Sequence, residues 1–317
     1  MNARVYIVLL VLIFLAGPLS AQPIGIVNAC DFCIASQGIS PLEMGRTGLR
    51  YDVRYLKLSK EYSDGKLVAN SSNESEEFFT NQFTLSYQLA SDISLIEIVP
   101  VATKTARMSE TDMNSSETIT NTGFGDVLLI GRYNLFADHS LTTTKIVAMS
   151  AGLKLPTGGT HFRDAAGEIA DPDMQLGTGS LDAVVAANVL YGTHDLAVAF
   201  NTTATFTSKG ANGHQYGNNV NYDATARYRV YCKMDDCAPS LFATAGIIGE
   251  WRAHELQDGV IDPNSGGNVI YVAPGVQAFL SQSISFEARF QLPIVHALNG
   301  DQLGETYKIA SGLQYLF

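Results

Sequence analysis

Charged side chains are scarce in this 317-residue chain, at 16% of all residues, whereas an average soluble domain carries roughly 25%. Basic residues are also outnumbered, with 20 Lys and Arg against 31 Asp and Glu, which gives a net charge of −11. This sign does not suit a phosphate backbone, so we expect no nucleic-acid partner. Long apolar runs are absent after the N-terminus, which excludes a membrane protein built of several helices.

The N-terminus has the pattern of an export signal. Arg4 precedes an apolar run over residues 5–16, and the small residues before Gln22 offer a cleavage site. An uncleaved anchor is the alternative, but the run is short for a membrane span. Lipoprotein cleavage before Cys30 fits poorly, because the apolar run ends too far upstream. We therefore expect a signal peptide over 1–21.

Apolar and polar residues alternate along most of the mature chain, which is the signal for strands with two different faces. In residues 49–55, for example, apolar or aromatic residues at the odd positions alternate with Arg50, Asp52 and Arg54. Each segment is long enough for a tilted strand that crosses a bilayer. Twelve segments show this pattern, at about 48–60, 78–90, 93–103, 124–136, 144–155, 180–191, 195–207, 220–231, 240–254, 268–281, 284–294 and 305–317, although 93–103 and 268–281 are apolar on both faces.

The connections between these segments alternate between short and long, which is typical of a barrel with short periplasmic turns and long extracellular loops. A strand in hydrocarbon cannot leave its backbone groups unpaired, so the sheet must close on itself. The sequence thus predicts an all-β fold, a twelve-stranded antiparallel transmembrane β-barrel over 47–317 in the Gram-negative outer membrane. Residues 22–46 would form a periplasmic or plug segment. The long loops are expected over 62–77, 103–123, 156–178, 208–219, 255–267 and 295–304.

Aromatic residues lie near the strand ends or on the apolar faces, where the girdles of a membrane barrel belong. The alternative is a soluble barrel with these rings packed inside. The terminal Phe317 follows an alternating aromatic strand, which predicts recognition by the barrel-assembly machinery. The girdle candidates are Tyr51, Tyr55, Tyr133, Tyr191, Tyr228, Trp251, Tyr307 and Tyr315.

Four stretches resemble a family of outer-membrane barrels labelled as transporters of the MetA pathway of phenol degradation. They are 123–136 (GFGDVLLIGRYNLF), 152–158 (GLKLPTG) with 175–182 (QLGTGSLD), 249–252 (GEWR), and 272–275 (VAPG) with 291–294 and 298–300. The resemblance implies a twelve-stranded barrel, and the family label implies uptake of aromatic compounds.

Charged residues on the polar faces should line the lumen. Basic and acidic groups are nearly balanced, which favours an internal network of ion pairs over a field of one sign. A polar diffusion path can coexist with such a network. The lining candidates are Arg50, Asp52, Arg54, Glu97, Asp126, Arg132, Lys154, Asp182, Asp223, Arg227, Arg229, Glu250, Arg252, Glu287, Arg289 and Lys308.

The four cysteines form two closely spaced pairs, Cys30 with Cys33 and Cys232 with Cys237. Disulfides are the default in the oxidising periplasm. A metal or redox role remains open for Cys30 and Cys33, although Ile34 in place of His disfavours haem. We expect no cofactor, no metal site and no catalytic residue, since the sequence offers no Ser and His arrangement for a hydrolase.

Three functions remain open. The first is an outer-membrane channel for passive passage of a small, amphipathic or aromatic solute. The second is a plugged barrel whose Cys30 and Cys33 segment docks a periplasmic redox or metal-handling protein. The third, and least favoured, is a hydrolase embedded in the barrel. Acid-rich outer loops also suggest divalent-cation bridges to lipopolysaccharide, so outer-membrane lipid is an expected partner.

Overall fold

The computed structural model describes residues 47–109, 116–140, 143–164, 166–232, 239–281 and 283–317. β-Strands make up most of this part of the chain, with two short 3-10 helices, η2 (Pro172–Met174) and η3 (Ala211–Gly213). No helix in the described ranges is long and apolar enough to cross a membrane. The expected signal peptide and residues 22–46, with Cys30 and Cys33, lie outside the described residues and stay predictions.

The described strands form one closed antiparallel barrel with twelve membrane crossings, as the sequence predicted. Closure is made by the first and last strands, which pair from Gly48 opposite Leu316 to Ser63 opposite Asp301, with register shifts between Lys57 and Lys60. The crossings are β1 (Gly48–Ser63), β3 (Ser75–Gln88), β4 (Ile93–Ser109), β5 with β6 (Ser116–Phe124 and Val127–His139), β7 (Thr143–Leu155), β8 (Asp182–Thr193), β9 (Leu196–Phe206), β11 (Asn219–Cys232), β12 (Ser240–Arg252), β15 (Gly267–Phe279), β16 (Ile284–Leu298) and β17 (Asp301–Leu316).

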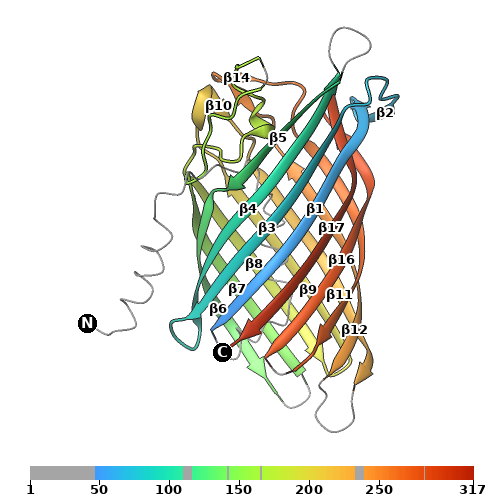
Figure 1. Cartoon of the computed structure of the whole chain (residues 1–317). Helices are drawn as coiled ribbons and strands as arrows, with labels where there is room; N and C mark the ends of the chain where they lie inside the picture. The colour runs from blue at the N-terminus through green and yellow to red at the C-terminus, as the bar shows by residue number, and fades with distance from the viewer. Residues whose placement is uncertain (1–46, 110–115, 141–142, 165, 233–238, 282) are drawn as a thin grey trace, which may run out of the picture.

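The two rims of the barrel differ (Figure 1). Short turns and both ends of the barrel chain lie at one rim, which we assign to the periplasm because outer-membrane barrels are built in this way. The other rim carries the long loops, the short strand β2 (Lys66–Val68) and a separate three-stranded sheet. This small sheet consists of β10 (His214–Gln215), β13 (Leu256–Gln257) and β14 (Val260–Ile261).

The apolar face of the strands points outward. Tyr51, Tyr191, Tyr228 and Trp251 are 38%, 48%, 59% and 45% exposed, whereas Asp52 on the opposite face of β1 is fully buried. This is the reverse of a water-soluble barrel and the arrangement that lipid requires. The soluble alternative is therefore wrong, and the protein is a barrel of the Gram-negative outer membrane.

Two of the expected long loops are mostly strand. β4 continues to Ser109 and pairs with β5, so the predicted loop 103–123 is largely a hairpin. Its outward face carries threonines, which hydrogen-bond across the pair from Thr105 to Thr120 and from Thr122 to Thr103. The predicted loop 295–304 is a tight turn between β16 and β17. Sequence reasoning missed these extensions because strands above the membrane no longer need an apolar face.

One crossing is interrupted. β5 pairs only with β4, and β6 takes over the pairing with β4 and β7 after Gly125 and Asp126. The sequence predicted a single uninterrupted strand over 124–136. The break frees the Asp126 side chain and backbone from the ladder at the point where a long loop enters the barrel.

Candidate functional site: a loop folded into a two-sided lumen

Arginines and two carboxylates line the periplasmic half of the lumen. Arg50 donates to Asp52, with Nη2 and Oδ1 2.6 Å apart, and also binds Glu287 on β16. Contacts of further arginines include Arg54 with Gln82 at 3.0 Å, Arg132 with Asn134 at 3.2 Å, Arg227 with Gln277 at 2.7 Å, and Arg229 with Asp195 at the rim at 2.6 Å.

Ion pairs between basic side chains and buried carboxylates lie in the lumen farther from the periplasmic rim. Lys308 Nζ lies 2.8 Å from both oxygens of Glu250, and Arg252 lies 3.4 Å from Glu305. Glu250 and Glu305 are each 2% exposed, so both carboxylates are held inside the barrel with a cation beside them. Removal of one partner from such a buried pair is costly, because the remaining charge has no water to solvate it.

The structure places fifteen of the sixteen predicted lining residues on inward-facing positions. Arg50, Asp52, Asp126, Arg132, Lys154, Asp182, Asp223 and Glu250 are buried. The rest are partly buried and keep the inward parity of their strands: Arg54, Arg227, Arg229, Arg252, Glu287, Arg289 and Lys308.

Glu97 is the exception, and its assignment to the lumen is wrong. It alternates with Ile96 and Ile98, which are buried inside at 5% and 1% exposure. Its direct neighbours across the sheet are Leu85 on β3 and Leu129 on β6, both on the outer face. The carboxyl group therefore points toward lipid. The sequence placed Glu97 in the lumen because its apolar neighbours along the strand were expected to face lipid. Here the inward face of β4 is itself apolar, so this expectation fails.

Two apolar clusters lie on the lumen wall over β4 and β6–β9. One inward cluster is formed by β4, β6 and β8, and a second by β7, β8 and β9. This explains why the segment 93–103 was apolar on both faces. The lumen is thus two-sided: these apolar clusters lie across the barrel from the charged groups of β1 and β16, although Arg132 on β6 lies among the apolar strands. The two clusters are Ile96, Ile98, Leu128, Ile130, Val184 and Ala186, and Ile146, Ala148, Leu190, Ala197 and Ala199.

The loop between β7 and β8, residues 156–181, folds into the barrel. Met174 and Leu176 on it are 1% and 0% exposed. Lys104, inward on β4, donates through Nζ to the carbonyl oxygens of Asp173 and Gln175, the latter at 2.8 Å. Asn121 on β5 donates to the Met174 carbonyl at 2.9 Å. These bonds satisfy backbone carbonyls that would otherwise be buried without partners.

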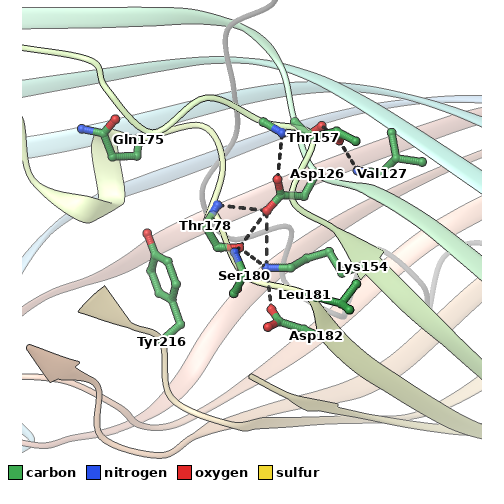
Figure 2. A network of polar contacts seen from close by, with 12 residues as sticks. Asp126, Val127, Lys154, Thr157, Gln175, Thr178, Ser180, Leu181, Asp182 and Tyr216 are labelled. Carbon is green, nitrogen blue, oxygen red and sulfur yellow. Dashed lines mark hydrogen bonds and ion pairs between the residues drawn. The ribbon is translucent and has the colours of Figure 1, made fainter. Parts of the chain in front are cut away.

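The base of this loop is fixed by Asp126 at the strand break (Figure 2). Its carboxylate accepts the backbone N–H of Gly158 at 2.9 Å and both the N–H and the hydroxyl of Thr178, at 2.9 and 2.8 Å. Lys154 Nζ lies 3.4 Å from Asp126 and 2.6 Å from Asp182. We call Asp126, Lys154, Thr178 and Asp182 the loop anchor.

Glycine is needed where the two ends of the loop meet. A Cβ atom on Gly177 would lie 2.6 Å from the backbone carbon and oxygen of Gly158. No side chain fits that contact, so the close approach of the two loop ends depends on Gly177. The residues of 123–126, 154–158 and 175–182, far apart in sequence, therefore form a single structural unit.

An extracellular cap covers the loop. Tyr216 donates its hydroxyl to the Pro172 carbonyl at 2.7 Å, and His214 Nε2 lies 3.1 Å from Glu255 Oε2. Burial lowers the pKa of His214, but the hydrogen bond and charge of Glu255 raise it more, so the net shift is upward. Burial raises the pKa of Asp173, and the nearby Glu255 adds to that rise.

The family model for the putative MetA pathway of phenol degradation matches residues 63–294. The chain belongs to this family. The matched region contains the whole loop anchor, so two of the four stretches that suggested the resemblance, 123–136 and 152–158 with 175–182, hold the loop in the barrel.

One solved structure shows the same fold. The COG4313 outer membrane channel from Pseudomonas putida F1 has a TM-score of 0.63 at 15% identity, over 86% of this chain and 96% of that one. Weaker likenesses are the AIDA-I transport unit from Escherichia coli (TM-score 0.46, 13% identity, 91% and 97% covered) and the CymD monoaromatic hydrocarbon channel (0.42, 10%, 92% and 92%). No curated protein matches the sequence.

Sequence reasoning missed three groups of this family member's interior. Lys104 was assigned to a loop, although it keeps the inward parity of Ile96 and Ile98 along β4. Glu305 was left out because its segment was expected to begin there. Nothing in the sequence indicates that Asp173 lies inside the barrel, because a loop sequence does not reveal that the loop turns inward.

The described part of the chain does not test the expected cysteine chemistry, because Cys30, Cys33 and Cys237 lie outside it. It contains no group of three His, Cys, Asp or Glu side chains placed to hold a metal ion. Cys232 ends β11, but Cys237 lies outside the described residues, so their disulfide stays a prediction.

Proposed function

We propose that this family member is a passive outer-membrane channel for a small amphipathic solute with an aromatic ring. The observation that carries the proposal is the two-sided lumen, in which β4 and β6–β9 turn two clusters of apolar side chains toward the interior. Apolar walls suit a ring, and polar groups opposite orient it. The family's link to phenol degradation and the likeness to outer-membrane channels support the same conclusion.

The loop between β7 and β8 sets the width of the path in this proposal. It occupies the lumen and is tied to the wall by buried bonds from Lys104 and Asn121. A channel narrowed in this way excludes large solutes and brings small ones into contact with both walls. The work of the protein is therefore selection by fit, with the solute gradient as the driving force.

A swelling assay with proteoliposomes tests this function. The full-length protein is reconstituted, and entry of phenyl glucoside is compared with entry of methyl glucoside, which is smaller, and of a disaccharide, which is larger. Faster entry of the phenyl compound is expected, because only its ring can use the apolar wall. Equal rates would reject an aromatic solute, and no swelling with any of these solutes would favour a plugged scaffold over a channel.

A further inference from the structure

The charges inside the barrel are sorted by height. Within seven residues of the periplasmic strand ends, the described inward-facing charged side chains are six arginines and only two carboxylates, Asp52 and Glu287. Carboxylates with lysine partners lie farther up. Positive and negative side chains are nearly balanced over the whole lumen, but its periplasmic part is a positive zone. This zone lies in a chain whose net charge is −11. The arginines are Arg50, Arg54, Arg132, Arg227, Arg229 and Arg289.

Arg289 is the member of this zone that is poised for a ligand. Its Nη1 atom is buried and has no hydrogen-bond partner among the described residues. Its neighbours across the sheet are Gly275 on β15 and Ala310 on β17, neither of which can offer a carboxylate. A buried donor without a partner costs free energy that an incoming acceptor would recover.

The space in front of Arg289 has the same two-sided character as the lumen. It is a gap of about 520 Å³, including the part open to the lumen, with Arg289, Glu287 and Gln277 of β15 and β16 on one side and Leu190, Ala197 and Ala199 of β8 and β9 on the other. Arg227 also lines it, beside Ala197. The gap is narrow, so a ring enters only when a side chain moves. Arg289 can move, since no partner holds its Nη1 in place.

We propose that this gap is a binding site for small aromatic monoanions, with the carboxylate on Arg289 and the ring on the wall of Leu190, Ala197 and Ala199. The proposal rests on the proposed channel function and names its solute class. A guanidinium group matches a carboxylate through two parallel hydrogen bonds, which gives geometry as well as charge. The surrounding positive zone attracts anions and repels cations on the way.

Calorimetric titration of the detergent-solubilised full chain at pH 8 tests the site without relying on conductance. The probes are benzoate, benzamide, which has the ring without the charge, and acetate, which has the charge without the ring. Benzoate should bind about tenfold or more tightly than either, since a charge-assisted hydrogen bond and a buried ring each contribute that much.

Variants test the contributions of the charged side and of the apolar side of the site separately. Arg289→Gln should weaken benzoate binding about tenfold and leave benzamide unchanged, while Leu190→Asn should weaken benzoate and benzamide but not acetate. Lys209→Gln, which removes one exposed positive charge of an extracellular loop beside Asp258, is the matched control and should bind benzoate normally. Arg289→Lys keeps the charge but loses the two parallel hydrogen bonds of the guanidinium group. Its benzoate affinity should fall between those of the wild type and Arg289→Gln.

The outcomes are distinct. Unchanged benzoate binding in Arg289→Gln, or equal binding of benzoate and benzamide by the wild type, overturns the anion site. Folding of each variant is checked by its heat-modifiable mobility in gels, and Arg289→Lys carries the test if Arg289→Gln does not fold. Benzoate binding without any solute entry into proteoliposomes would reject the channel and leave the site intact.

Discussion

Lys154 Nζ lies 2.6 Å from the Asp182 carboxylate, directly opposite it on the neighbouring strand, with the side chains only 9% and 1% exposed. The two residues flank a 26-residue loop, residues 156–181, that turns into the lumen. Their pairing therefore closes the base of this loop at the height where β5 gives way to β6. A short ion pair inside the barrel thus positions the segment that narrows it.

Replacement of Lys154 by methionine should destabilise the barrel by about 3–5 kcal/mol, because Asp126 and Asp182 would both remain buried without a cation. Urea unfolding of the refolded protein, followed by gel mobility, measures this loss. Lys145→Met on the same strand is the matched control, since Lys145 is half exposed and lies 4.0 Å from Asp138. Equal stability of the two variants would contradict a structural role for the loop anchor.

Shortening the inserted loop should widen the path. Replacement of residues 159–176 by a brief Gly-Ser linker removes Met174 and Leu176 from the lumen and keeps the loop anchor. Single-channel conductance in planar bilayers should rise severalfold, since the loop occupies space that ions would otherwise use. The control shortens the small extracellular sheet between Gln257 and Val260. A conductance that does not change would show that the constriction lies elsewhere.

Glu97→Leu should stabilise the protein in a lipid bilayer. The side chain points outward between Leu85 and Leu129, where a carboxyl group costs roughly 1 kcal/mol relative to an apolar residue. Unfolding in lipid vesicles measures the gain, and conductance should stay as in the wild type. A change in ion selectivity on this substitution would mean that Glu97 faces the lumen after all.

The extracellular cap should loosen as the pH rises. The raised pKa of His214 means that its pairing with Glu255 is fully present below the pKa of the unfolded chain and is lost as the pH passes the higher folded value. The raised pKa of Asp173 acts in the same direction, because its charged form is disfavoured in the fold. Hydrogen exchange of residues 212–217, corrected for intrinsic rates, should therefore be slower at pH 6 than at pH 8.5.

The variant His214→Gln should lose most of this pH dependence and keep the exchange rates of the barrel strands. A matched test is His161→Gln, which replaces a histidine of the inserted loop that lies beside Thr160. Identical pH profiles for wild type and His214→Gln would show that the pairing with Glu255 does not hold the cap.

The number of crossings and the direction of most side chains could be read from the sequence, because a strand alternates its faces with a period of two. This rule placed Arg50, Asp52, Glu250 and Lys308 inside. It failed at Glu97, where an apolar inward wall removes the contrast between faces. It also ended β4 too early, since above the membrane Thr103 and Thr105 replace the outward apolar residues.

What the sequence by itself determined is therefore the class of barrel and its membrane, since lipid dictates an apolar exterior and a closed sheet. Only the tertiary structure decided that Asp126, Lys154 and Thr178 meet, that a loop enters the lumen, and that arginines gather in its periplasmic half. These contacts join strands distant in sequence, and their register follows from barrel closure and tilt. No local pattern along one strand contains that information.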